Sequence, residues 1–372
     1  MTMEPTILET KTEEKSISES TTYQKGVKHL CECGVSKVPN KYIFPVSERK
    51  GEEPKNSGSN LKLPVIDFDQ LKGSNRCQVL NSLSKACEDF GFFQVINHGI
   101  PDDIIQNMIE TSRGFFELPL EERSKYMSTD VRAPVRYGTS FNQINDSVYC
   151  WRDFLKLACH SLPDSVPHWP SSPADLRDAA STYAEENKSL FKMIMEAILE
   201  SLGLIRTTET DDDNDVLKEF EDGSHLTVIN CYPSCPQPEL TLGMPPHSDY
   251  GFLTLLLQDE VEGLQIQHKG EWVTVEPIPN AFVINIGDHL EIFSNGRYKS
   301  VLHRAIVNST KCRTSIASLH SMPMMNMVKP SPKLINEENP RRYKDTNFAT
   351  FIDFIASNDL KEKSFLDSRK LT

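Results

Sequence analysis

The second half of the chain is a series of short apolar segments separated by turn-forming residues, and this pattern restricts the fold more than any other feature. Each segment is too short for a stable helix, is rich in Val, Ile, Leu and Thr, and ends near Pro, Gly or Asn, which indicates β-strands. Several such strands in succession predict a β-barrel or β-sandwich. The predicted strands between Leu226 and Met327 are LTVINCY, FLTLLLQ, GLQIQHK, EWVTVEP, AFVINIG, HRAIVN and TSIASLH.

Helical periodicity flanks this β-rich region on both sides. Apolar residues recur at three- and four-residue steps over 75–90, over the segment that Pro101 opens, and over about 173–204, which predicts three amphipathic helices. A last helix is expected at 348–360, and short strands are expected at LKLPVIDFDQL and GFFQVINHGI. Helices around a β core predict one α+β domain.

We expect four segments along the chain. Residues 1–58 are polar and end in a stretch rich in Gly, Pro and Ser, so the first two dozen are expected to be disordered and the rest extended. A helix-rich part follows at 59–215 and packs on the β core at 216–330. The chain closes with a C-terminal helix and tail at 331–372.

The composition excludes several classes of protein. A formal net charge of −13 is unfavourable for binding phosphate backbones or anionic lipid. The nine cysteines cannot all pair within the chain, and the N-terminus lacks the basic and apolar regions of a signal peptide. No apolar run reaches the roughly 18 residues of a membrane span. We therefore expect a cytoplasmic monomer with reduced thiols and with no nucleic-acid or membrane partner.

Two polar residues, His247 and Asp249, stand directly before the apolar strand FLTLLLQ. Side chains two positions apart in an extended chain project to the same face, so this pair can offer a nitrogen and an oxygen to one metal ion. A lone His-x-Asp pair is more often a surface feature or a hydrogen-bonded pair. His303, in the separate segment KSVLHRAIVN, supplies a third ligand. Two imidazoles and one carboxylate on one side of an ion suit non-haem Fe(II), with positions left open for oxygen.

Arg313 and Ser315 alternate on a further apolar strand, ten residues beyond His303. A buried guanidinium is unfavourable unless an anion meets it. Together with the Ser315 hydroxyl, Arg313 makes a suitable socket for a carboxylate ligand. A salt bridge to a core Asp or Glu is the alternative, and the predicted metal ligands favour the socket.

These motifs together resemble the plant 2-oxoglutarate- and Fe(II)-dependent dioxygenases, of the type that hydroxylates or demethylates specialised metabolites. The resemblance extends from about Leu61 to Leu360, with the motifs in the family's order. The motifs that carry it are GFFQVINHGI, FFELPLEER, WRDFLKL, NCYPSCPQP, HSD, GDHLEIFSNGRYKSVLHR, RTS and RYKDTNFATF.

The resemblance implies a double-stranded β-helix, or jelly roll, flanked by N-terminal and C-terminal helices. The sequence has Cys231 where the family's motif has a tyrosine, and strand alternation turns Cys231 away from the face that its two neighbours share. By resemblance, iron is assigned to His247, Asp249 and His303, and 2-oxoglutarate to Arg313, Ser315, Tyr232 and Asn230.

The resemblance also implies an enzyme that uses Fe(II), 2-oxoglutarate and O2, with ascorbate as reductant, and that releases succinate and CO2 while it oxidises a small molecule. Removal of a hydrogen atom from a substrate C–H bond and return of hydroxyl give hydroxylation, and the same attack on a methoxy carbon gives O-demethylation. The sequence does not choose between these outcomes.

Residues expected to face the substrate, again by resemblance, are Tyr137, Phe141, Leu319 and Ser321, while residues 151–153 are expected to support the wall beside them. This wall is mainly apolar, and we expect no additional Arg or Lys on it. We therefore expect the substrate to be a largely apolar metabolite, such as a flavonoid, coumarin, alkaloid, terpenoid or phenolic hormone.

Two other functions remain open. The chain could be an oxidase of the same fold that uses ascorbate in place of 2-oxoglutarate, and the intact Arg313, Ser315 and Tyr232 argue partly against this. It could also be a small-molecule receptor that has lost catalysis. A complete set of predicted metal ligands argues against a receptor, because disuse gives no reason to keep buried charges.

Overall fold

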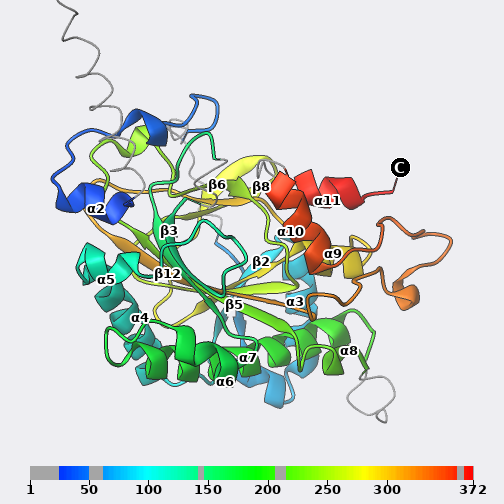
Figure 1. The fold of residues 1–372 in the computed structure, drawn as a ribbon. Coiled ribbons are helices and arrows are strands. Elements are labelled where there is room, and N and C mark those ends of the chain that lie inside the picture. The colour runs from blue at the N-terminus through cyan, green and yellow to red at the C-terminus, as the bar shows by residue number, and fades with distance from the viewer. Residues whose placement is uncertain (1–24, 50–61, 141–145, 206–214, 358–363, 372) are drawn as a thin grey trace, which may run out of the picture.

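The computed structural model describes residues 25–49, 62–140, 146–205, 215–357 and 364–371, whose strands form two sheets (Figure 1). With helices packed around them, the sheets form the predicted jelly roll. The larger sheet has eight strands in the order β1 (Val65–Asp67), β2 (Phe92–Ile96), β10 (Phe282–Ile286), β7 (Leu253–Gln258), β12 (Arg313–Ser321), β5 (Ser224–Tyr232), β4 (Asp153–Ala158) and β3 (Val135–Thr139). The smaller sheet has four, in the order β6 (Met244–His247), β11 (His303–Ala305), β8 (Leu264–His268) and β9 (Glu271–Thr274).

The predicted strands after Leu226 are confirmed, each within a few residues of its expected bounds. The segment 59–215 does more than pack on the core, however, because it supplies β1, β2, β3 and β4 to the larger sheet. The sequence did not predict β4 as a strand, because its large apolar residues do not alternate with polar ones. Both faces of β4 are mostly buried, and a strand buried on both faces loses the period-two pattern.

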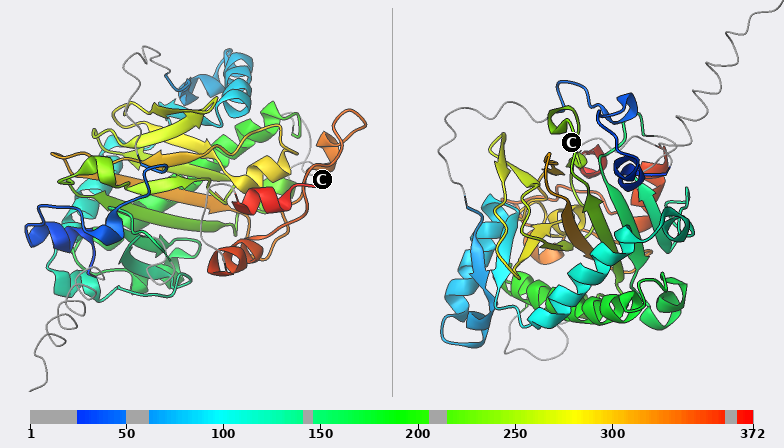
Figure 2. Two further views of the ribbon diagram at one scale, coloured as in Figure 1. Left: turned by 90° about the horizontal axis from the view of Figure 1, so that it is seen from above. Right: turned by 90° about the vertical axis from the view of Figure 1, so that its left-hand side faces the viewer.

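Three helices cover one side of the larger sheet. The predicted helices are confirmed as α3 (Arg76–Asp89), α4 (Asp102–Glu117) and α7 (Leu176–Ser201), and α7 contacts both of the others and β7. Figures 1 and 2 show α4 and α7 lying across the same side of the strands. Among the described residues, no helix has the length and apolar character to cross a bilayer.

The remaining helices are short, except for α10 at the C-terminal end, which matches the predicted last helix. They are α2 (Val27–Glu32), α5 (Leu120–Ser124), α6 (Leu162–Ser165), α8 (Asp215–Lys218), α9 (Asp288–Phe293), α10 (Phe348–Ser357) and α11 (Ser364–Arg369), with 3-10 turns at Asn40–Tyr42, Phe68–Lys72, Val166–His168, Pro238–Leu240 and Pro332–Leu334.

The two faces of the larger sheet have different surroundings. Residues paired directly across strands point to the same face, so Ile316, Ile229 and Leu155 share one face, which we call the outer face. All three are fully buried in the main core, together with residues of α4 and α7.

The opposite face, which we call the inner face, carries Arg313 and the residues in phase with it. In β5 and β12 the outer-face residues are buried, whereas inner-face Leu226, Val228, Ala317 and Leu319 are half-buried. Solvent therefore reaches the middle of the inner face, even though these strands lie inside the sheet.

The N-terminal lead-in differs from the expected extended segment. Residues after Lys25 form α2, and Val27, Leu30 and Tyr42 are buried in a cluster with Trp151. The backbone N–H groups of Val27 and Lys28 donate to the two carboxylate oxygens of Asp153, at 2.7 and 2.9 Å. The predicted disorder of the first two dozen residues lies outside the described residues.

Candidate metal centre

The three predicted metal ligands meet at one end of the inner face. His247 ends β6 and His303 begins β11, and these antiparallel strands pair the two histidines directly. The Nε2 atom of each histidine lies 3.8 Å from a carboxylate oxygen of Asp249. One donor atom from each residue lies within 4.8 Å of the others, and this is the one such group among the described residues. The three side chains can therefore bind a single ion.

The carboxylate of Asp249 is held by two donors from the inner face. Thr254 Oγ1, in β7, and Asn285 Nδ2, in β10, both donate to Asp249 Oδ2, at 2.5 and 2.9 Å. Both donors are almost fully buried. Because both hydrogen bonds fall on Oδ2, Oδ1 keeps its lone pairs for a metal ion. Such outer contacts orient a ligand and adjust its affinity for metal.

Backbone and aromatic contacts orient the two imidazoles. His247 Nδ1 lies 2.8 Å from the carbonyl oxygen of Pro245, and His303 Nδ1 lies 3.3 Å from that of Val301. A proton on each Nδ1 leaves each Nε2 as the electron-pair donor on the side of Asp249. The ring of Phe92, from β2, packs edge-on against His303 with centroids 5.4 Å apart.

The protonation states of these groups suit metal binding. Burial and the neighbouring His303 lower the pKa of His247 to about 4, so its imidazole is neutral near pH 7. Burial acts to raise the pKa of Asp249, but the two histidines and the two hydrogen bonds outweigh it and hold that pKa below its ordinary value. Neutral imidazole and carboxylate are the forms that bind metal.

The donor set fits Fe(II). Two nitrogens and one oxygen approach from neighbouring strands, and their side chains keep 20%, 12% and 10% exposure for His247, Asp249 and His303. Solvent access leaves coordination positions open, which is the arrangement of non-haem Fe(II) oxygenases. Bound there, Fe(II) would supply the oxidising chemistry with 2-oxoglutarate and O2.

The predicted carboxylate socket lies on the same face. Arg313 is 2% exposed at the start of β12. Its Nε donates to the carbonyl oxygen of Val261 at 3.1 Å, and a terminal nitrogen donates to Gln258 Oε1 at 2.9 Å. Both acceptors are neutral, and no carboxylate within the described ranges forms an ion pair with Arg313. The alternative salt bridge to a core acid is therefore absent there, and the charge can meet an anionic ligand.

The other residues of the predicted socket surround this guanidinium. Tyr232 and Asn230 pair directly with Arg313 and Ser315 across β5 and β12, and the guanidinium carbon lies 5.1 Å from the centre of the Tyr232 ring. Cys231 turns to the outer face, as expected, and its Sγ lies 3.6 Å from that of Cys312.

Close packing fixes the position of Arg313. A Cβ atom added at Gly263 would lie 2.7 Å from Arg313 Cδ and 3.0 Å from its Nε. These distances are too short for a side chain to be accommodated without movement of the arginine. The absence of a side chain at Gly263 therefore permits the present position of the guanidinium.

The residues expected to face the substrate have different locations. Tyr137 pairs with Leu155 and points to the outer face, where it is fully buried and its hydroxyl donates to Asp153 Oδ2 at 3.0 Å. The prediction that Tyr137 lines the substrate site is wrong, because the phase of β3 turns it into the core. Phe141 lies outside the described residues.

Leu319 and Ser321 lie on the inner face, in phase with Arg313. Leu319 is half-buried and packs with Tyr250 and Phe348. Ser321 is buried, and its Oγ lies 2.8 Å from His289 Nδ1. Their contact with a substrate stays a prediction.

Basic residues also stand on the inner face, contrary to the expected apolar wall. Arg136 pairs with Lys156, and Lys156 pairs with inner-face Val228. Arg152 donates to Asn230 Oδ1 at 3.1 Å. The guanidinium carbons of Arg136 and Arg152 lie 5.1 and 4.9 Å from the ring centre of Phe154. The sequence did not reveal these cations because the phase of β3 and β4 was unknown.

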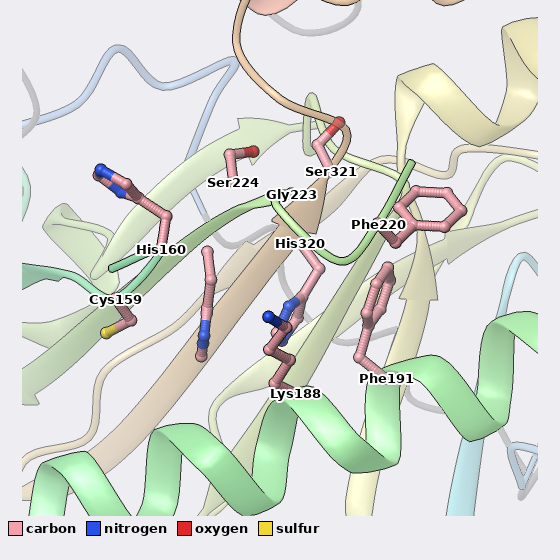
Figure 3. A pocket seen from close by; sticks show the side chains of 10 residues that line it. Cys159, His160, Lys188, Phe191, Phe220, Gly223, Ser224, His320 and Ser321 are labelled. Carbon is pink, nitrogen blue, oxygen red and sulfur yellow. The ribbon is translucent and has the colours of Figure 1, made fainter. Parts of the chain in front are cut away.

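A small pocket lies between α7 and the ends of β5 and β12, and Ser321 is among the residues that line it. Figure 3 shows Lys188 and Phe191 of α7 beside His320, near the ends of β5 and β12. His320 pairs with His225, both are out of phase with Leu319, and His320 Nε2 lies 2.8 Å from Asn187 Oδ1. Burial lowers the pKa of both histidines, so they act as neutral core groups.

Comparisons with known proteins agree with this geometry. Residues 223–321 match the 2OG-Fe(II) oxygenase superfamily, and residues 63–175 match the family described as non-haem dioxygenase in morphine synthesis N-terminal. Among curated relatives, the chain is 41% identical to Protein DMR6-LIKE OXYGENASE 2 of Arabidopsis thaliana, over 90% of this chain and 95% of the relative. It is 40% identical to Flavanone 3-dioxygenase 2 of Oryza sativa subsp. japonica, over 89% and 93%.

Solved structures show the same fold. The crystal structure of JOX2 in complex with 2OG, Fe and JA is 34% identical, with a TM-score of 0.81, and the match covers 93% of this chain and 98% of that one. The rice dioxygenase for auxin oxidation is 26% identical, with a TM-score of 0.70 over 83% of this chain and 100% of that one. The chain therefore belongs to the plant 2-oxoglutarate- and Fe(II)-dependent dioxygenase family and is an enzyme of that family.

Proposed function

We propose that this dioxygenase hydroxylates, or oxidatively O-demethylates, a mainly apolar plant metabolite. The observation that carries the proposal is that the candidate iron ligands lie at one end of the inner face, which solvent reaches. The middle of this face is lined by Leu226, Val228, Ala317 and Leu319. An apolar skeleton bound against these side chains would remove them from water and present a C–H bond toward the metal.

The proposed site has a metal end and a socket end, and each binds a different group. At the metal end the three candidate ligands would hold Fe(II), which would supply the oxidising chemistry with 2-oxoglutarate and O2, with ascorbate as reductant. The socket end binds the distal carboxylate of 2-oxoglutarate by a charge-assisted hydrogen bond. The assigned residues are His247, Asp249 and His303 for iron, and Arg313, Ser315, Tyr232 and Asn230 for 2-oxoglutarate.

Two relatives support a small organic substrate. One is named for a flavanone, and the solved structure of JOX2 holds the molecule abbreviated JA. We further propose that this chain acts as a cytoplasmic monomer with no nucleic-acid or membrane partner, in keeping with its net charge of −13.

The proposal is tested by succinate formation in the presence of Fe(II), ascorbate and 2-oxoglutarate. We expect Asp249→Ala to abolish turnover, because the metal loses its one anionic ligand. The exposed Asp345 offers a matched control, and Asp345→Ala should behave like the unmutated enzyme. Equal turnover in the Asp249→Ala and unmutated enzymes would contradict the metal assignment.

A second variant separates the ascorbate-dependent oxidase from the dioxygenase. Arg313→Ala should lose most of its affinity for 2-oxoglutarate, because the socket loses the guanidinium that is assigned to the distal carboxylate. Unchanged affinity would contradict the socket. An untargeted metabolite screen, in which losses are matched to gains of one oxygen or losses of CH2, identifies the reaction, and tight ligand binding without CO2 release would favour the receptor.

A further inference from the structure

The inner face carries a charged row beside its apolar row. Arg136 of β3 and Lys156 of β4 pair directly, and Lys156 pairs in turn with Val228 of β5. Val228 pairs with Ala317 of β12. Basic and aliphatic side chains therefore lie on one continuous surface. Lys156, Val228 and Ala317 are half-buried, so solvent reaches this part of the surface, whereas Arg136 is 3% exposed.

Two of the cations form no ion pair within the described part of the chain. Lys156 Nζ donates to the carbonyl oxygen of Val131 at 2.7 Å. Arg152 donates to Asn230 Oδ1 and to the carbonyl oxygen of Ser140, each at 3.1 Å. Arg152 is 5% exposed, and its Nε has no hydrogen-bond partner in the described part of the chain. The hydrogen-bond acceptors of both charged groups are therefore neutral, which is unfavourable for the buried Arg152 and for the half-buried Lys156.

Neighbouring acids balance only part of this charge. Asp130 and Asp146 act on Arg136, and Asp130 acts also on Lys156. Burial, followed by the charge of Arg136, still lowers the pKa of Lys156 to about 8. These surroundings destabilise the charged ammonium, which is nevertheless mostly protonated near pH 7. A bound anion would relieve both effects.

The far end of the same surface is aromatic. Phe348 and Phe351 of α10 stack on Tyr250 with ring centroids 4.3 and 4.8 Å apart, and this group packs against Leu226 and Leu319. An ion pair of 3.1 Å between Arg132 and Asp353 ties α10 to the loop before β3. A molecule on the inner face would thus meet cations along one edge and apolar groups along the other.

We propose that the substrate of this enzyme is an apolar molecule that carries a carboxylate, and that Lys156, assisted by Arg152, binds the carboxylate. The inference rests on the proposed function and narrows its substrate class. Lys156 has further N–H donors beyond the one given to Val131, so it can bind the carboxylate without leaving its present position.

The test is equilibrium dialysis of the enzyme loaded with Fe(II) and 2-oxoglutarate under nitrogen. The probes are a mixture of aromatic and terpenoid carboxylic acids, each paired with its own methyl ester, and mass spectrometry measures bound and free amounts. We expect the enzyme to retain acids in preference to their esters. Lys156→Met should weaken the retention of acids by about 10- to 100-fold, the size of one charge-assisted hydrogen bond, and should leave esters unaffected.

Lys188→Met is the matched control, because Lys188 also donates to a backbone carbonyl but lines the small pocket between α7 and the ends of β5 and β12. It should retain acids like the unmutated enzyme, and circular dichroism checks that each variant is folded. Equal retention of acids and esters, retention of no acid, or unchanged retention of acids by folded Lys156→Met would overturn the inference. Succinate formation by the unmutated enzyme tests the proposed function separately.

Discussion

The hydroxyl of Thr254 should determine how tightly the candidate site holds its metal. It lies 2.5 Å from Asp249 Oδ2 and is 3% exposed, so water cannot easily replace it. A hydrogen bond to a charged group contributes about 1.5–3 kcal/mol. Thr254→Val keeps the shape and removes the donor, and Asn285 still supplies the other hydrogen bond at 2.9 Å. We therefore expect the affinity for a divalent metal to fall by about 10- to 100-fold.

The measurement is an anaerobic calorimetric titration of the metal-free enzyme with Mn(II), with and without 2-oxoglutarate. Thr274→Val is the control, because Thr274 Oγ1 accepts a hydrogen bond from Gln265 at 3.1 Å in the smaller sheet and does not touch the ligands. An unchanged Mn(II) affinity in Thr254→Val would refute the reasoning. So would an equal loss in both variants, because it would indicate a general effect on the fold.

Further predictions concern the socket, the N-terminal helix and the charged row. Gly263→Ala should displace the Arg313 side chain and raise KM for 2-oxoglutarate by about tenfold or more, while Mn(II) affinity is kept. A KM equal to that of the unmutated enzyme would show that the added methyl group does not disturb Arg313. Asp153→Ala should leave the two N–H groups of α2 buried without acceptors and lower the free energy of unfolding by about 3 kcal/mol, which urea unfolding measures; an unchanged midpoint would contradict this. Lys156→Met should stabilise the ligand-free enzyme by up to about 3 kcal/mol, since burial lowers the pKa of Lys156 from 10.5 to about 8. The unfolded chain binds more protons between these pH values, so stability of the unmutated enzyme should rise from about pH 8 to 10.5, and the variant should lack this rise.

The grouping of the three candidate metal ligands could be predicted because most of their signal is local. His247 and Asp249 lie two apart on one extended segment, and His303 lies in a motif of fixed order. Thr254 and Asn285 could not be predicted, because each is an ordinary polar residue of a buried strand whose contact with Asp249 depends on the pairing of β7 with β10.

Which residues of β3 point to the inner face could not be predicted, because this depends on strand phase. Arg136 and Tyr137 are neighbours, so one faces inward and the other outward, and both are almost fully buried. A shift of one residue exchanges the two faces. The sequence favours the tyrosine for an apolar wall, whereas the pairing of β3 with β4 selects the arginine.

The short α2 also has no local signal. Six residues cannot form a stable helix alone, and the acceptor that holds its first turn lies 126 positions along the chain from Val27. Only the folded sheet brings Asp153 to it.

The dependence of α2 on Asp153 affects where the protein can be cut. The family match begins at residue 63, beyond α2, so a fragment that starts there would leave the Asp153 carboxylate without its backbone donors. It would also uncover Trp151 and Tyr232, which pack in the cluster with Val27, and Tyr232 belongs to the candidate socket. The segment that the family match omits is thus part of the folding unit, and a fragment lacking it should bind 2-oxoglutarate poorly although every assigned ligand is present.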